Sequence, residues 1–270
     1  MMASMPNGMT DFTVPLEVAK LVIEAPIASF RHPHFLIARQ PTFDSPPPST
    51  IYGLLAAALA DWPAPDTFRF AYSFRFRGRA SDLEHQHVIY LQGGKLKTQD
   101  GVYPKVIEGD VQPHLRDFLF QCTLELYLTP ASLGQAFLTP QFALSLGRSQ
   151  DLATVTSVST LSLQPSPKGY WEDTILPFSF RDRVPSSGTV LLPRFIEPPP
   201  QRNPHFERYI NLRGKLFAGL TDSALVSPIH KLLPLQGKEE RCLVDTQTPV
   251  VHGAHRALHF LTCSDADGQS

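Results

Sequence analysis

The sequence predicts an α+β fold. Three observations support this: a strongly apolar helical segment follows a run of three prolines, alternating apolar segments typical of strands lie on both sides of it, and a second short helical segment follows later. The order of strand, helix, strand, polar excursion, strand, helix and strand is typical of a ferredoxin-like (RRM-like) domain. We expect the excursion to be a long β-hairpin and the last third to be a small β-rich C-terminal appendage.

The predicted domain runs over residues 12–165, and its hairpin covers about 81–113, with a Gly93-Gly94 turn. Residues 166–263 form an irregular β-rich region, because only short strand patterns occur at 190–192 and 257–261. Within it, the proline-rich stretch 197–204 is typical of a stiff spacer. Residues 264–270 are polar, and we expect a disordered tail there.

Residues 16–23 alternate and predict the first strand, and the helix is expected from Ser49 or Thr50 to about Ala60. Either hydroxyl could cap the first turn, and Pro63 would end the helix soon afterwards. We expect the N-terminus of this helix to face outward, where free backbone N–H groups favour an anion. Its apolar positions recur at helical spacing: Ile51, Leu54, Leu55, Ala58 and Leu59.

The segment 68–79 alternates with period two, which places aromatic residues on one face of a strand and arginines on the other. The aromatic face must be buried, whereas the other face is either a basic stripe or an ordinary solvated surface. Further strands are predicted at 115–128, 142–146 and 152–163, with a short helix at 131–138. The aromatic face comprises Phe68, Phe70, Tyr72, Phe74 and Phe76, and the basic face includes Arg69, Arg75, Arg77 and Arg79.

Composition limits the possible functions. The chain has 270 residues, 42% hydrophobic and 18% charged, with a net charge of −1, so no global basic field attracts nucleic acid and any contact must use local clusters. The three cysteines include no CxxC pair, which argues against a disulfide framework or a structural zinc site. We see no signal peptide and no apolar run of membrane-spanning length, and we expect a cytoplasmic protein.

Three segments together resemble one known family. These are ASFRHP at 28–33, PPPSTIYGLLAA at 46–57 and LGRSQDL at 146–152. The sequence resembles the Cas-five family, the subunit that caps the 5′ handle of the guide RNA (crRNA) in prokaryotic CRISPR type I interference complexes (Cascade). The likeness is best over roughly the first 160 residues and is closest to the I-B-like branch. It implies the same ferredoxin-like fold.

Single-stranded RNA is held by cationic contacts to phosphate, by stacking on aromatic rings and by hydrogen bonds to splayed bases. The sequence offers such groups in a loop, on the hairpin, in the turn after residue 146 and on the basic stripe. The resemblance implies that the turn and the hairpin hold the handle. The predicted RNA-binding residues are Arg31, His34, Arg39, Arg75, Arg77, Lys95, Lys97, Lys105, Gly147, Arg148, Ser149 and Gln150.

Arg148 is the strongest single candidate, because its planar guanidinium can bind a phosphate or a base edge with two hydrogen bonds. The alternative is a solvated turn arginine that pairs with Asp151. His32 with His34, and His85 with His87, could each present two imidazoles on one side, but no third ligand follows at a recognisable spacing. We therefore expect no metal and no cofactor.

We expect a non-catalytic RNA-binding subunit that binds the 5′ handle and contacts the Cascade backbone subunit, the large subunit and, through the complex, target DNA, with no membrane partner. One alternative is a metal-independent endoribonuclease that processes precursor crRNA, with His85 or His87 and Lys95 as acid and base. Another is a scaffold whose aromatic and proline-rich surfaces contact protein alone.

Overall fold

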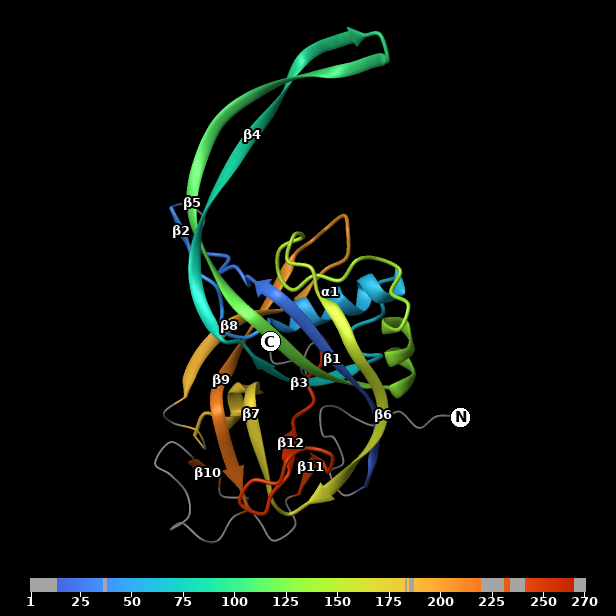
Figure 1. Cartoon of the computed structure of the whole chain (residues 1–270), viewed down its shortest axis with the longest axis vertical. Coiled ribbons are helices and arrows are strands. Elements are labelled where there is room, and N and C mark those ends of the chain that lie inside the picture. The colour runs from blue at the N-terminus through green and yellow to red at the C-terminus, as the bar shows by residue number, and fades with distance from the viewer. Residues whose placement is uncertain are drawn as a thin grey trace, which may run out of the picture.

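A computed structural model describes residues 14–35, 38–182, 184, 187–219, 231–233 and 241–264, the segment 231–233 by its backbone alone. The protein is mostly β-structure: a curled, mixed half-barrel sheet forms the body, and one long hairpin rises from it and curves over its top (Figure 1). The predicted tail beyond Ser264 lies outside the described residues.

The expected α+β, ferredoxin-like (RRM-like) fold is wrong. In the described residues the chain forms a single α-helix, α1 (Pro48–Leu59), and the second predicted helix is a 3₁₀ segment, η1 (Ala131–Phe137), with another short one at η2 (Phe178–Phe180). The 3₁₀ form has poorer hydrogen-bond geometry and stays short. The C-terminal strands also continue the same sheet instead of forming a small appendage, so strands dominate the whole chain.

The centre of the sheet is β1 (Leu16–Ala28), which pairs antiparallel with β5 (Gly101–Thr129) on one side and β6 (Thr154–Ser166) on the other. β3 (Arg69–Arg75) pairs antiparallel with the second half of β5, and the two-residue β2 (Arg39–Gln40) runs parallel to its middle. The segment 142–146, predicted as a strand, forms only a single bridge, between Ser145 and Leu152. β5 therefore joins the body to the hairpin.

The helix α1 packs its apolar side into the main core, as its spacing predicts, with Ile51, Leu54 and Leu55 almost fully buried. It ends at Ala60, which adopts the left-handed conformation. The expected outward-facing N-terminus is wrong: the triple proline is buried, and the Tyr72 hydroxyl donates a hydrogen bond to the Pro46 carbonyl at 2.8 Å. No side chain caps the helix, because it begins at Pro48, before Ser49 and Thr50.

The alternation at 68–79 predicts β3 correctly on its aromatic side, where four of the five rings are at most 2% exposed and Phe76 is half-buried. The opposite side is only partly open, because Ala71 and Ser73 are also buried. C-terminal residues cover that end of the sheet in a second apolar cluster, which includes Val18, Tyr127, Leu243 and Phe260. The predicted basic stripe is therefore exposed only from Arg75 onward.

The second half of the chain adds strands to the β6 edge in the order β6, β11, β12, β7, β9, β10, with β8 on β9. The expected spacer at 197–204 is instead the turn between β8 and β9, in which Ile196 pairs with Pro204. Bounds are β7 (Gly169–Pro177), β8 (Gly188–Ile196), β9 (Pro204–Ala218), β10 (Lys231–Leu233), β11 (Cys242–Asp245) and β12 (Arg256–Leu258).

A charged network fastens these strands to the first sheet. Lys20 Nζ lies 2.7 Å from Asp245 Oδ2, which also accepts a hydrogen bond from the Tyr127 hydroxyl at 2.8 Å. Arg256 bridges Glu125 at 2.8 Å and Glu172 at 2.7 Å. Burial opposes ionisation of Asp245, but its hydrogen bonds from Lys20, Tyr127 and the Gln247 backbone keep its pKa below the ordinary value.

The hairpin of β4 (Gly78–Thr98) and β5 stands out from the body as a two-stranded ribbon (Figure 1). Its pairing shifts register between His87 and Ile89 and again between Gln92 and Lys95. Such bulges increase the local twist of a ribbon. Among the described residues no helix is long and apolar enough to span a membrane, and the three cysteines are buried and unpaired.

Candidate nucleic-acid interface at the base of the hairpin

Two of the sequence motifs meet in the fold. Gly147 in the LGRSQDL turn lies directly on the backbone of Ser29 in the ASFRHP segment, and a Cβ at Gly147 would fall 2.1 Å from the Ser29 carbonyl oxygen. Gly147 also has φ +105°, which side chains rarely adopt. A glycine is therefore required where these two loops touch.

Both loops rest on β5, at the point where the hairpin leaves the body. The Ser29 hydroxyl donates a hydrogen bond to the Asp117 carbonyl at 2.8 Å. The buried Asp117 carboxylate accepts hydrogen bonds from Ser81 of β4 at 2.6 Å and from Arg39 at 3.2 Å. Burial alone would raise the pKa of Asp117, but these hydrogen bonds and the charges of Arg39 and Arg79 hold it below its ordinary value. Asp117 thus remains ionised and ties β2, β4 and β5 together.

A second carboxylate connects the hairpin to the turn. Glu84 of β4 forms an ion pair with Arg116 of β5 and accepts a 3.3 Å hydrogen bond from the Gln150 amide. Burial opposes its ionisation, but the contact with Arg116, helped by the hydrogen bond from Gln150 and the charge of Arg148, lowers its pKa. The hairpin base and the LGRSQDL turn are therefore one polar unit.

Arg148 adopts the alternative that the sequence left open. Its Nε and Nη2 bind the fully buried Asp151 carboxylate at 2.8–3.1 Å, and its side chain is only 15% exposed. This geometry gives Arg148 a part in holding the turn. The neighbouring Ser149 and Gln150 are exposed, and the role of all three toward RNA stays a prediction.

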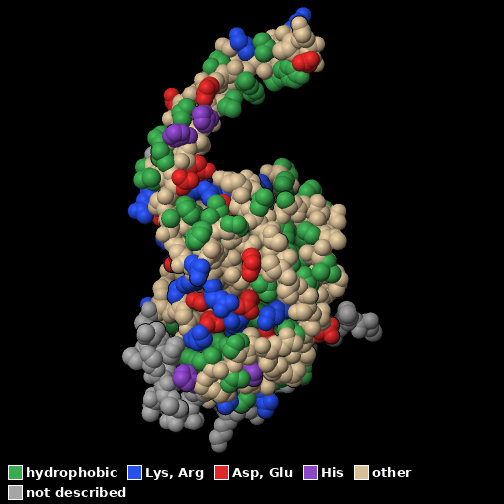
Figure 2. Space-filling view, viewed as in Figure 1, with side chains coloured by type: hydrophobic (Ala, Val, Ile, Leu, Met, Phe, Trp, Pro, Cys, Tyr) green, Lys and Arg blue, Asp and Glu red, His purple; other side chains and the backbone are tan. Residues whose placement is uncertain are grey.

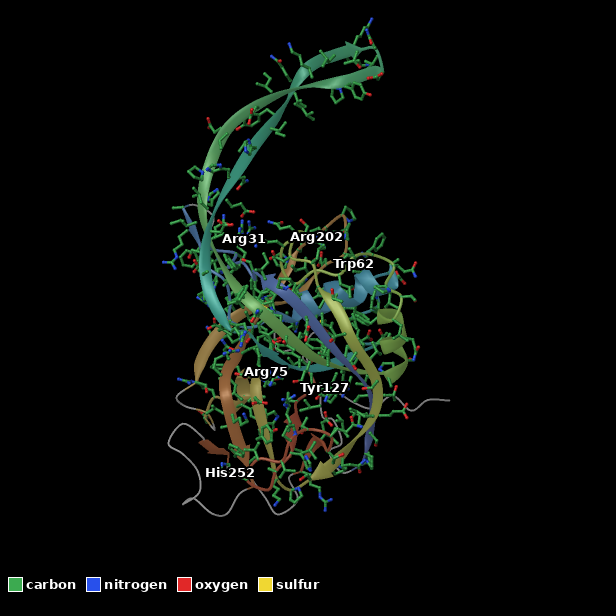
Figure 3. All side chains as sticks on the ribbon, viewed as in Figure 1. Arg31, Trp62, Arg75, Tyr127, Arg202 and His252 are labelled. Atoms are coloured by element: carbon green, nitrogen blue, oxygen red, sulfur yellow. The ribbon has the colours of Figure 1, made fainter. Side chains whose placement is uncertain are left out.

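Arg31 differs from the other arginines at this base, because the structure gives its side chain no partner among the described residues. Its backbone pairs with Thr42, whose carbonyl oxygen accepts a hydrogen bond from Arg79 at 3.2 Å. Figure 3 places it beside the foot of the hairpin. The other four arginines there each face a carboxylate, in the pairs Arg39–Asp117, Arg79–Asp44, Arg116–Glu84 and Arg148–Asp151.

The hairpin itself carries the predicted lysines far from the body. Lys95, Lys97 and Lys105 are exposed, and no carboxylate in the described residues forms an ion pair with them. Figure 2 shows cationic side chains near the free end of the hairpin. The hairpin also exposes aromatic rings, since Tyr90 is 58% and Tyr103 50% exposed. Free cations next to exposed rings are the groups that single-stranded nucleic acid requires.

Arg75 lies on the body, away from the free end of the hairpin (Figure 3), and Figure 2 shows a patch of mixed charge on this face of the body. Arg75 pairs with Glu125 at 2.9 Å, and Arg77 donates a hydrogen bond to the Gln121 side chain at 2.8 Å. Arg75 lines an open cavity of about 340 Å³ with Lys20, Lys215 and Arg256. Arg75 therefore joins the charged network of the body instead of the hairpin-base cluster.

The described residues contain no group of three or more His, Cys, Asp or Glu side chains placed to hold a metal ion. His34 is exposed and stacks on Phe206 with ring centroids 6.0 Å apart. His87 Nδ1 lies 2.6 Å from the Glu108 carboxylate on the exposed hairpin.

Sequence reasoning missed the carboxylates and arginines that pair across the hairpin base. Asp117, Arg116 and Glu84 lie in segments predicted only as strand or hairpin. Alternation of acid and base at facing positions of the two strands could have indicated them. It also missed the exposed Trp62 and the Arg202 guanidinium that lies 5.9 Å from its ring centroid.

Comparison with solved structures gives weak likenesses. A chain of a CRISPR RNA-guided surveillance complex matches at 17% identity and TM-score 0.34, over 49% of this chain and 61% of that one. A Cas protein matches at 19% identity and TM-score 0.28, over 49% of this chain and 57% of that one. A CRISPR protein from Archaeoglobus fulgidus matches at 11% identity and TM-score 0.35, over 74% of this chain and 90% of that one. The chain thus spans less than two thirds of the first two. No curated protein sequence matches it.

The sequence family described as CRISPR-associated protein (Cas_Cas5) matches residues 19–175. This range is more than half of the chain and includes the motif segments 28–33, 46–57 and 146–152, the helix α1 and the whole hairpin. The chain therefore belongs to the Cas5 family of CRISPR-associated proteins.

Proposed function

We propose that the chain is a non-catalytic, RNA-binding subunit of a CRISPR type I surveillance complex (Cascade), in which it holds the 5′ handle of the crRNA. In this role it contacts the backbone and large subunits and reaches target DNA only through the complex. Membership of the Cas5 family supports a place in a CRISPR complex. The polar side chains at the hairpin base support the binding of RNA.

One observation carries the proposal. The cations of the body are paired with carboxylates wherever they are buried, whereas Arg31 and the three hairpin lysines are exposed and have no carboxylate partner within the described residues. When an unpaired cation of the protein binds a phosphate, counterions are released from the nucleic acid. The affinity therefore falls as the salt concentration rises. The hairpin and its foot therefore present a group of cations that is suited to bind an RNA backbone.

The test measures binding of labelled handle RNA to the full chain over a range of salt concentrations. A variant with Lys95, Lys97 and Lys105 all changed to Gln, and a separate Arg31→Ala variant, should each bind more weakly and with a shallower salt dependence. Lys168→Gln is the matched control, because Lys168 is exposed at the β6–β7 turn, at the opposite end of the body from the hairpin (Figure 1). Equal binding by all four proteins contradicts the proposal.

One contact favours the alternative, a metal-independent endoribonuclease. Glu108 holds His87 by Nδ1, which leaves Nε2 available as a general base. Lys95, however, is eight residues further along β4, roughly 26 Å of extended strand, which is too far for it to act on the same phosphate as His87. Incubation of repeat RNA with the protein in EDTA decides between the two. Specific cleavage that His87→Ala abolishes would establish the enzyme.

A further inference from the structure

Trp62, just beyond the C-terminus of α1, is an exposed aromatic residue on a rigid support. It is one of two tryptophans and is 37% exposed, whereas Trp171 is 5% exposed. Its ring centroid lies 5.3 Å from that of the buried Tyr52. Tyr52 in turn stacks on Phe68 at 5.9 Å and donates a hydrogen bond to the Pro63 carbonyl at 3.0 Å. The indole is therefore backed by the core and held in place.

Arg202 lies over this indole from the turn between β8 and β9. Its guanidinium is 5.9 Å from the Trp62 ring centroid, which is within cation–π range. The nearby Glu197 carboxylate is occupied by Asn203 at 2.8 Å and His205 at 3.1 Å. No carboxylate of the described residues pairs with Arg202, whose side chain is exposed. Asp61, next to Trp62, accepts a hydrogen bond from the Trp62 backbone N–H at 2.8 Å.

The backbone at Arg202 is also unusual, with φ +55°. A left-handed conformation is unfavourable for a residue other than glycine, and such strain is concentrated at functional positions. Here the strained residue forms no ion pair that would contribute to folding. Its described contact is with the Trp62 ring, and its exposed guanidinium can in addition bind a ligand.

The β8–β9 turn, which carries Arg202, lies between Trp62 and the loop that carries Arg31. On one side Phe195 packs against Tyr52 at 5.1 Å, and on the other Phe206 stacks with His34 at 6.0 Å. Figure 3 shows Arg31, Arg202 and Trp62 along the upper part of the body, beneath the hairpin. An RNA strand held at the foot of the hairpin would have this surface next to it.

We propose that Trp62 and Arg202 form a stacking site for one base of single-stranded RNA, an inference that rests on the proposed function. Every base has a π-face, so an exposed indole binds bases with little sequence preference. The guanidinium carbon lies 5.9 Å from the ring centroid, and two groups that sandwich a base stand about 7 Å apart, so a small opening of the turn would admit a base between them. Arg202 can then stack on the base or bind the adjoining phosphate.

The experiment uses the full chain, a short single-stranded RNA and an abasic RNA of the same length. Binding of the base-containing RNA should quench tryptophan emission, and Trp62→Leu should remove the quenching while the emission of Trp171 persists. Trp62→Leu should also weaken that RNA by about 5- to 150-fold and leave the abasic RNA unaffected. Trp62→Phe should restore most of the affinity, and Arg202→Gly, which relieves the backbone strain, should weaken binding.

The outcomes separate the two proposals. If the wild-type protein binds RNA through the hairpin lysines but Trp62→Leu binds equally well and no quenching occurs, the stacking site is wrong and the proposed function stands. If Trp62→Leu weakens the binding of abasic RNA to the same extent as that of the base-containing RNA, Trp62 supports the fold instead, and the proposed stacking site is again wrong. If the wild-type protein binds neither RNA, the proposed function itself fails.

Discussion

The body and the hairpin use charged side chains of the same types in opposite ways. In the body, Arg256 is 4% exposed and bridges two carboxylates, and Lys20 bonds to the buried Asp245. On the hairpin, Lys95 and its neighbours stand in solvent without an acidic partner among the described residues. Buried charges must be paired to offset desolvation, whereas exposed unpaired charges add almost nothing to stability. The first group therefore holds the fold together, and the second is available for a ligand.

Arg256→Met is the strongest test of this contrast. It removes the buried guanidinium that bridges the Glu125 and Glu172 carboxylates, so the free energy of unfolding should fall by about 3–5 kcal/mol. Denaturant titration measures this loss. Arg75→Met is the matched control, because Arg75 pairs with the same Glu125 from a side chain that is 50% exposed, and it should cost less than about 1 kcal/mol. Equal losses would show that the network is not what fastens the C-terminal strands.

The histidines repeat the contrast in their response to pH. Burial lowers the pKa of His259 to about 4 from an ordinary value of 6.5. The unfolded chain then binds a proton that the folded chain refuses, so stability is full above pH 6.5 and falls as the pH drops toward 4, by up to roughly 3 kcal/mol. His259→Phe should flatten this part of the stability curve. The exposed His85→Gln should leave it unchanged, and an effect of similar size there would contradict the assignment.

At lower pH, the carboxylates determine how the free energy of unfolding changes with pH. The pKa values of Asp245 and Glu172 are lowered in the fold, so their contributions are present above the ordinary values of 3.8 and 4.5 and are lost as the pH falls through the lowered folded values. Asp245→Asn should reduce this acid-induced loss measured by denaturant titration. If Asp245→Asn leaves the loss of stability at low pH unchanged, the network contributes little to stability.

Gly147→Ala tests the contact between the two motif loops. The new Cβ would meet the Ser29 backbone, and φ is +105°, so we expect a loss of about 1–3 kcal/mol in the free energy of unfolding. Gly188→Ala is the control, since an added Cβ there has nothing within 4 Å and φ is not positive. If the two variants are equally stable, the turn does not pack as described.

The smallest effect on stability is expected on the hairpin. Changing Lys95, Lys97 and Lys105 together to Gln should alter the free energy of unfolding by less than about 0.5 kcal/mol, because exposed unpaired side chains contribute little. The same variant should show weaker RNA binding with a shallower salt dependence. A large loss of stability would mean that these lysines belong with the paired charges of the body.

The sequence predicts local elements well where the periodicity is strong. Both α1 and the aromatic face of β3 follow from their apolar spacing. The fold class does not follow, because an apolar pattern at 131–138 cannot show that the segment forms a 3₁₀ turn, and the proline-rich second half hides strands that pair over long distances. β6, for example, pairs with β11 more than seventy residues later.

The candidate site shows the same division. The motif segments and the hairpin lysines can be found in the sequence, and so can the possibility that Arg148 pairs with Asp151. The meeting of Glu84 with Gln150, or of Trp62 with Arg202, depends on tertiary packing between distant residues. No local pattern contains that information.

The most direct measurement is crosslinking of the 5′-handle nucleotides to protein in the purified intact complex, followed by identification of the crosslinked peptides. We expect crosslinks to the hairpin at 81–113 and to the loops at 28–33 and 146–152. Crosslinks confined to the charged face lined by Lys20, Lys215 and Arg256, or to other subunits altogether, would contradict it.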